Sequence, residues 1–178
     1  ADAGCFDNLK ITILADDELP AMPKSVTFGG TAFAAAGVTV SGDTVSGSGA
    51  MLSKEPLRGD YRVTFSLAAK GNSRLYFGMT DAENGYAFEI NEAETSVNLY
   101  KITDGYYETL GEKETVIRKG FCDVTLDVHD GIASLYYDNL FEGDGAFPKF
   151  EFYLDGTDGK LGFWLEGGQL ANLTVGAS

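Results

Sequence analysis

The chain has 178 residues, of which 44% are hydrophobic and 12% aromatic, and this composition is typical of one globular domain rather than a disordered chain. Its formal net charge of −14 opposes contact with phosphate backbones and anionic membrane surfaces, so we expect neither nucleic acid nor a membrane as partner. No apolar run is long enough for a membrane-spanning helix, and no basic, apolar leader opens the sequence, so we expect a mature domain of a larger protein.

The first 24 residues contain an apolar segment and then an acidic one with two prolines. Residues 1–14 alternate as a strand, and residues 15–24 are predicted to be a linker or crossover. Residues 4–11 also resemble residues 168–175, since both share a glycine, a large apolar residue and Asn-Leu at the same spacing. The first strand therefore either closes a preceding tandem domain or lies beside the last strand. We favour the second arrangement because an orphan apolar strand would promote aggregation.

Residues 25–178 are dominated by short segments in which every second residue is apolar. The clearest are 61–67, 75–79, 86–90, 97–99, 122–128 and 161–165. Asn-Gly and Asp-Gly pairs between them favour the tight turns that close hairpins. The sequence therefore predicts an all-β fold, an antiparallel two-sheet jelly-roll sandwich, with residues 1–178 in a single domain and the core in 25–178.

The two cysteines and the single histidine offer little for chemistry. Cys5 and Cys122 both fall on inward positions of their segments, so they form either one disulfide, as suits a secreted protein, or two buried thiols. Two cysteines and His129 do not make a zinc site. No nucleophile motif accompanies His129, which adjoins an Asp-Gly pair and is expected in a surface turn.

The order of strands and turns resembles the concanavalin A-like/laminin-G-like superfamily. The resemblance covers residues 26–175 and is carried by segments 59–65, 75–79, 84–90, 97–101, 124–128, 159–164 and 171–175. Within that superfamily the chain is similar to carbohydrate-binding modules of secreted bacterial glycoside hydrolases, including fructan-binding ones. This resemblance implies an extracellular or cell-surface location and a polysaccharide ligand. Fructan-binding modules typically carry arginine after the phenylalanine of the second segment, whereas Gly78 follows Phe77 here, so no binding residue is carried over.

The outward strand positions supply the candidate ligand site. Sugars are bound by aromatic rings together with planar amide, carboxylate and guanidinium groups. The outward positions include Arg62, Arg74, Tyr76, Glu89, Asn91, Asn98, Tyr100 and Trp164. If these strands are neighbours, they form a polar face studded with aromatic rings; alternatively, loops or the N-terminal segment cover one or two rings. Tyr106 and Tyr107, in the predicted loop after Asp104-Gly105, form a second candidate platform.

Acidic turns suggest a structural calcium ion, although no cofactor is expected to be required. The candidate ligands are Asp155 and Asp158, and further acidic turns contain Asp81, Glu83, Asp138 and Asp144. None matches the EF-hand pattern, and Asp-Gly turns also form for backbone reasons alone.

Three functions fit these features. The principal prediction is a non-catalytic carbohydrate-binding module of an extracellular, bacterial glycoside hydrolase or surface protein. One alternative is a laminin-G-like adhesive domain that binds proteins. The other is a glycoside hydrolase that uses Glu89 and Glu94, since endoglucanases of this fold carry two glutamates at similar spacing, with aspartate where Asn91 stands here.

Overall fold

The computed structural model describes residues 24–115, 117, 119–138 and 148–178, and in this part of the chain regular structure consists of twelve β-strands without a helix. The strands are β1 (Lys24–Phe28), β2 (Thr31–Ser41), β3 (Thr44–Ser53), β4 (Tyr61–Ala68), β5 (Asn72–Met79), β6 (Gly85–Asn91), β7 (Ser96–Thr103), β8 (Tyr106–Glu114), β9 (Cys122–His129), β10 (Ile132–Asp138), β11 (Phe150–Tyr153) and β12 (Lys160–Gly176). Accordingly, no described helix could span a membrane.

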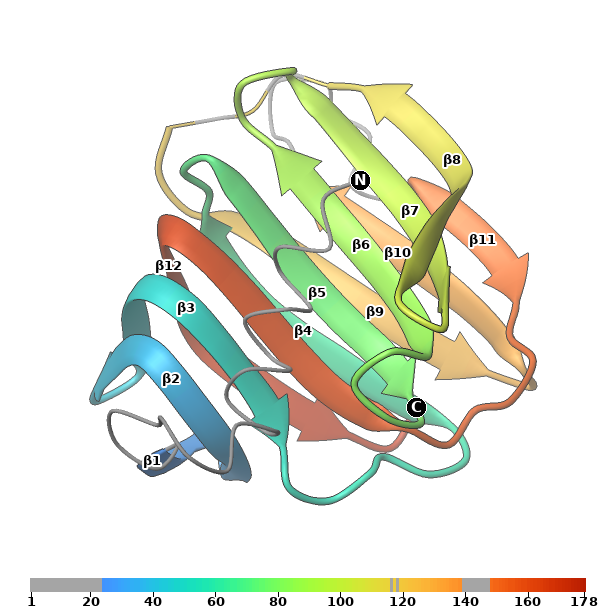
Figure 1. The fold of residues 1–178 in the computed structure, drawn as a ribbon, viewed down its shortest axis with the longest axis horizontal. Coiled ribbons are helices and arrows are strands. Elements are labelled where there is room, and N and C mark those ends of the chain that lie inside the picture. Colours follow the sequence, from blue (N-terminus) through green and yellow to red (C-terminus); the bar gives the residue numbers. More distant parts are fainter. Residues whose placement is uncertain (1–23, 116, 118, 139–147) are drawn as a thin grey trace.

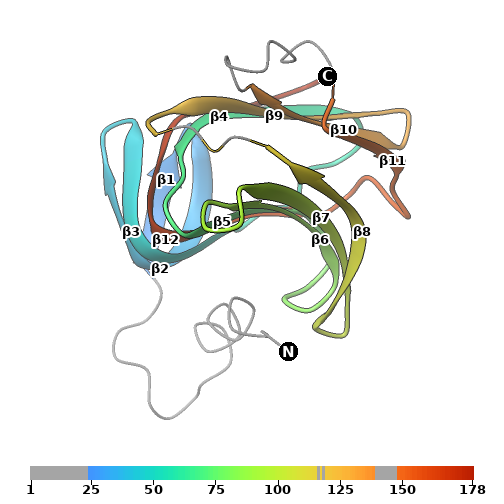
Figure 2. The same cartoon turned by 90° about the horizontal axis from the view of Figure 1, so that it is seen from above.

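All paired strands are antiparallel and form two facing layers, as the alternating pattern predicts (Figure 1). Their order is β11-β10-β9-β4-β12-β5-β6-β7-β8, with β3, β2 and β1 attached beside β12. Figure 2 shows β4, β9, β10 and β11 in one layer, facing β5, β6, β7 and β8 in the other. The prediction of an antiparallel two-sheet sandwich is confirmed.

The long strand β12 joins the two layers. Its first part, from Lys160 to Leu165, pairs with β5, and its last part, from Gln169 to Gly176, pairs with β4. Between them Gly167 has a φ of 81°, a backbone conformation that glycine adopts without steric cost. This bend lets one strand serve both sheets, so the sandwich is closed on this side.

The core lies between the layers and is built by the inward half of each alternating segment. Phe163 lies at its centre, with ring centroids 6.1 Å from Phe33 and 5.1 Å from Phe65. Cys122 is a buried free thiol in this core, so it forms no disulfide. Cys5, the predicted first strand and residues 15–23 of the predicted linker lie outside the described residues, and Lys24 already belongs to β1.

The β-bulge between β2 and β3 requires glycine at position 37, because there is no space for a β-carbon there. The φ of Gly37 is 73°, and a β-carbon there would lie 2.3 Å from the Ser48 carbonyl oxygen. Gly30 has a similar φ of 77° but open space around it. We expect Gly37→Ala to lower the free energy of unfolding by about 3 kcal/mol and Gly30→Ala by only about 1 kcal/mol, measured by urea denaturation. Equal losses would contradict this steric argument.

Candidate functional site

The predicted site residues come together on the outer face of β12, β5, β6 and β7, which is the face turned away from the core. They lie in three rows across the strands. The first row is Trp164, Arg74, Glu89 and Asn98; the second is Gly162, Tyr76, Ala87 and Tyr100; the third is Asn72, Asn91 and Ser96. Seven of the outward residues predicted from the sequence are therefore neighbours.

Arg62 is an exception, and its inclusion in this face was wrong. It lies on β4 in the opposite layer, where its guanidinium group lies 2.6 Å from the carboxylate of Asp127 on the paired strand β9. The alternating pattern identifies outward positions, but it does not say to which layer a strand belongs.

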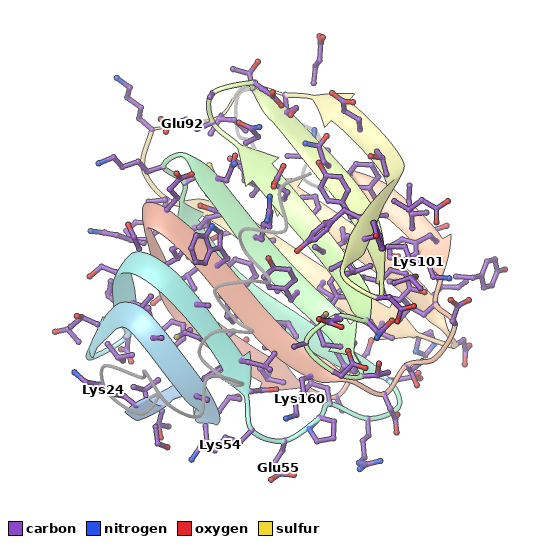
Figure 3. The ribbon with its side chains drawn as sticks, in the orientation of Figure 1. Lys24, Lys54, Glu55, Glu92, Lys101 and Lys160 are labelled. Atoms are coloured by element: carbon purple, nitrogen blue, oxygen red, sulfur yellow. The ribbon has the colours of Figure 1, made fainter. Side chains whose placement is uncertain are left out.

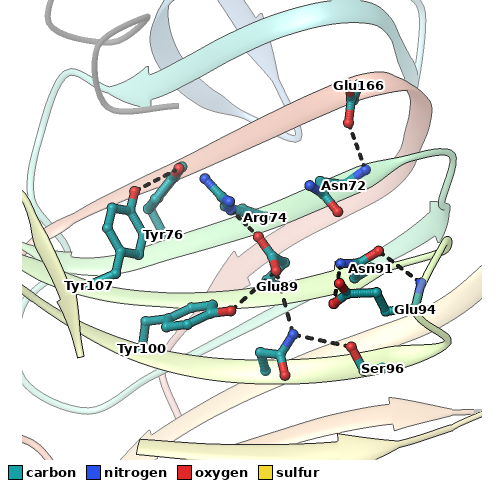
Figure 4. A network of polar contacts seen from close by, with 11 residues as sticks. Asn72, Arg74, Tyr76, Glu89, Asn91, Glu94, Ser96, Tyr100, Tyr107 and Glu166 are labelled. Carbon is teal, nitrogen blue, oxygen red and sulfur yellow. Dashed lines mark hydrogen bonds and ion pairs between the residues drawn. The ribbon is translucent and has the colours of Figure 1, made fainter. Parts of the chain in front are cut away.

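Glu89 is the centre of a buried polar network (Figure 4). Arg74 Nε donates to Glu89 Oε2, while Asn98 Nδ2 and Tyr100 OH approach Glu89 Oε1 at 3.5 and 3.4 Å. Only 4% of Glu89 is exposed. A carboxylate at this depth requires a cation and further donors to offset its lost hydration. The network therefore fixes the orientation of the polar groups in the middle of the face.

Aromatic rings border this network. Tyr107, on β8, packs edge-on against Tyr100 with 5.6 Å between ring centroids, and its ring lies 5.4 Å from the Arg74 guanidinium carbon. Trp164, on β12, pairs with Arg74 of β5, so it lies on the side of Arg74 that faces away from β6. Trp164, Tyr100 and Tyr107 are partly buried and retain exposed surface.

Two aromatic predictions need correction. Tyr76 is fully buried at 0% exposure, in a second apolar cluster with Ala87 and Ile102, and its hydroxyl lies 3.4 Å from that of Tyr107. It is therefore not an open platform. Tyr106 and Tyr107 are not a loop pair but the first two residues of β8, so they point to opposite faces. Tyr106 is 81% exposed, and only Tyr107 joins the site.

The glutamates of the hydrolase alternative serve contacts within the protein. Asn91 Nδ2 donates to Glu94 Oε2 at 2.8 Å, and Glu94 N donates to Asn91 Oδ1 at 3.1 Å, which fixes the turn after β6. Glu89 is held by the donors described above. A retaining hydrolase needs one carboxylate as nucleophile and another carboxyl group as proton donor. The contacts of Glu89 and Glu94 instead suit fixed acceptors.

Comparison with known proteins adds structural relatives. No family model and no curated protein matches the sequence. Among solved structures, the carbohydrate-binding module CBM66 from Bacillus subtilis matches with a TM-score of 0.67 and 17% identity, over 85% of this chain and 99% of that one. The exoplasmic/lumenal domain of VIP36, bound to Ca²⁺ and mannose, matches with a TM-score of 0.62 and 8% identity, over 82% of each chain. The fold is that of a concanavalin A-like β-sandwich. A Parabacteroides distasonis protein provisionally described as a glycosyl hydrolase shares this sandwich at a TM-score of 0.59 and 10% identity, over 79% of this chain and 90% of that one.

The acidic turns of the sandwich that contain Asp155 and Asp158 already face cationic side chains. Lys101 Nζ lies 2.5 Å from Asp155 Oδ2, and Arg58 lies 3.1 Å from Asp158 Oδ2. The hydrogen bond from Lys101 lowers the pKa of Asp155. A calcium ion at Asp155 and Asp158 would have to compete with these contacts, and the calcium site stays a prediction. The side chain of Asp138, together with Asn139 and Asp144, lies outside the described residues.

One group of potential metal ligands was not predicted. His129 Nδ1 lies 3.0 Å from Asp60 Oδ2, and His129 Nε2 lies 3.5 Å from Asp130 Oδ2. The ligand atoms of all three residues lie within 4.8 Å of one another. Asp60 is far from the other two in sequence, so no spacing pattern could indicate this group. Each imidazole nitrogen faces a carboxylate.

The hydrogen bond from Tyr100 to Glu89 should persist to high pH. Burial, and next the nearby Glu89 carboxylate, raise the pKa of Tyr100 to about 12. Ultraviolet difference titration of the wild type against Tyr100→Phe isolates the phenolate absorbance of Tyr100. We expect this absorbance to develop only near pH 12. If that absorbance developed near pH 10, the ordinary value for tyrosine, Tyr100 would be a solvated side chain and not part of the network.

Proposed function

We propose that this chain is a non-catalytic carbohydrate-binding module and that its ligand lies on the outer face around Trp164 and Tyr100. The observation that carries the proposal is the placement of partly exposed rings on either side of the ion pair between Arg74 and Glu89, on neighbouring strands. A saccharide has apolar C–H faces and polar hydroxyl edges. Rings flanking fixed donors and acceptors match both kinds of surface.

The charge of the protein narrows the ligand class. With 27 acidic and 13 basic residues, the chain repels uronates and sulfated sugars at long range. Neutral polysaccharides are therefore the proposed ligands. The similarity in fold to the carbohydrate-binding module CBM66 and to the mannose-bound exoplasmic/lumenal domain of VIP36 supports this direction.

The proposed context is a secreted bacterial enzyme or a surface protein of which this domain is one part. A binding module keeps an attached catalytic domain close to its insoluble substrate and so raises the effective substrate concentration. The similarity in fold to the exoplasmic/lumenal domain of VIP36 is compatible with an extracellular location.

Affinity electrophoresis through gels containing neutral polysaccharides tests the proposal. We expect the wild type to be retarded by at least one polysaccharide, and Trp164→Ala to bind at least about tenfold more weakly because a stacking surface is lost. The matched control is Tyr153→Ala, which removes a 79% exposed tyrosine from β11 in the opposite layer and should leave retardation unchanged.

Two outcomes would overturn the proposal. Absence of retardation across a broad set of neutral glycans would remove the binding function. Release of reducing sugar that is lost in Glu89→Gln would instead support the hydrolase alternative, because a binding module does not cleave its ligand.

A further inference from the structure

A pocket of about 250 Å³ opens at the end of β6 and β7, outside the network around Glu89. Its walls come from the loop before β6, from the end of β7 and from the loop that leads into β12, including Asn84, Lys101, Thr103, Asp155 and Asp158. Lys101 pairs with Tyr86 in the strand register, three residues along each strand from the pairing of Glu89 with Asn98, which corresponds to about 10 Å along the strands. Because three is an odd number of residues, the side chains of Lys101 and Tyr86 point to the opposite face of the sheet from Glu89 and Asn98. Lys101 is labelled in Figure 3.

Hydrogen bonds fix the walls of this pocket. Asn84 Nδ2 donates to both carboxylate oxygens of Asp81 at 3.0 Å, and Asn84 Oδ1 accepts from Asp104 N at 3.0 Å. On the opposite wall Asp155 N donates to Tyr86 OH at 3.1 Å. Gly59 N donates to Asp158 Oδ1 at 3.0 Å. A ligand would therefore meet groups that are already ordered, which reduces the entropic cost of binding.

The polar groups of this pocket are suited to hydrogen-bond two neighbouring hydroxyl groups of a ligand. Lys101 has three ammonium donors, of which one faces Asp155 Oδ2 at 2.5 Å. Its other donors lie beside the Asp155 carboxylate, which also takes a hydrogen bond from Tyr86, so ammonium donors and carboxylate acceptors lie side by side. Vicinal hydroxyls of a sugar ring can each accept from one group and donate to the other. Ile102 and Tyr86, which are buried, also line the pocket.

Charge and size narrow the ligand further. The pocket carboxylates Asp155 and Asp158 are paired with Lys101 and Arg58, so these four groups carry no net charge and suit a neutral ligand. Its volume of about 250 Å³ is below the range of about 300–1,000 Å³ typical of sites for drug-sized molecules. One ring of a glycan is the appropriate size.

We propose that this pocket is a second carbohydrate subsite that binds a single neutral sugar residue through Lys101 and Asp155. The inference rests on the proposed carbohydrate-binding function, but it concerns a different set of residues.

Two-dimensional ¹⁵N NMR titration of the whole chain tests this subsite. The probes are the methyl glycosides of glucose, galactose, mannose and fructose, with methyl glucuronide as the anionic comparison. We expect at least one neutral glycoside to shift the amide signals of Gly85, Thr103 and Gly156, and glucuronide to leave them in place. Lys101→Met and Asp155→Asn should each weaken this binding at least tenfold.

The control variants are Arg62→Met and Asp127→Asn, which break another surface ion pair, in the opposite layer, and should not change the titration. Spectra of the free variants establish that each one folds. Shifts confined to the Trp164 indole and its neighbours would overturn the second subsite and leave the proposed function standing. Shifts confined to the pocket would retain the subsite and reject the outer face as ligand site. Absence of shifts at both places would reject both proposals.

Discussion

Replacing Arg74 with methionine should lower the free energy of unfolding by about 3 kcal/mol. The side chains of Arg74 and Glu89 are only 11% and 5% exposed, so the pair lies largely out of water. Methionine preserves most of the side-chain volume but removes the cation, which leaves the Glu89 carboxylate buried without its charge partner. Losing one member of a buried ion pair typically costs about 3–5 kcal/mol. Urea denaturation at neutral pH measures the loss.

The double variant Arg74→Met/Glu89→Gln should recover most of that loss. Glutamine carries no charge and can still accept hydrogen bonds from Asn98 and Tyr100, so the cost of an unpaired buried charge disappears. The control is Arg62→Met, which removes the half-exposed partner of Asp127 and should cost no more than about 1 kcal/mol. Additive losses in the double variant would show that Arg74 stabilises the face through contacts other than its pairing with Glu89.

This ion pair also bears on the functional argument. Burying a charged pair on the outer face of a sheet seldom adds stability compared with apolar side chains of similar size. Its presence among aromatic rings is compatible with the proposed carbohydrate-binding function. Glu89 and Arg74 could be identified as outward from their strand positions. Their direct pairing could not, because strand register depends on partners distant in the sequence.

The strands themselves were predictable because alternation of apolar and polar residues reflects one buried face. Residues 61–67 and 122–128 follow that pattern, and the structure places them in paired strands β4 and β9. The bend in β12 was not predictable, since the pattern of residues 161–165 gives no sign that the chain crosses to the other layer after Gly167. For the same reason the sequence could not assign Arg62 to a layer.

The error at Tyr106 has a local cause. Asp104 and Gly105 both have positive φ, 50° and 79°, which is the geometry of a two-residue hairpin turn. The turn therefore ends at Gly105, and Tyr106 begins the next strand rather than extending a loop. The burial of Tyr76 has a tertiary cause, because it belongs to an apolar cluster with Ile102 of β7, against which Tyr107 of β8 packs, and the Tyr107 hydroxyl lies 3.4 Å from that of Tyr76. Alternation within β5 contains no information about a neighbour two strands beyond its own partner.

Substitutions of two adjacent residues on β12, Phe163 and Trp164, should affect stability and ligand binding differently. Phe163 points into the core against Phe33 and Phe65, whereas Trp164 lies on the outer face beside Arg74. We expect Phe163→Ala to lower the free energy of unfolding by about 4 kcal/mol, because it leaves a cavity between the two layers. Trp164→Ala should cost only about 1–2 kcal/mol, because its ring is partly exposed.

The effects of these two substitutions on retardation in glycan-containing gels should have the opposite order. Under conditions in which both variants remain folded, Phe163→Ala should bind polysaccharide as the wild type does. Trp164→Ala should bind it at least about tenfold more weakly. Because one residue step in a strand reverses the direction of the side chain, the two substitutions differ in face but hardly in position along β12. If both variants lost binding while folded, β12 would affect the ligand through its backbone shape, and Trp164 would not be a direct contact.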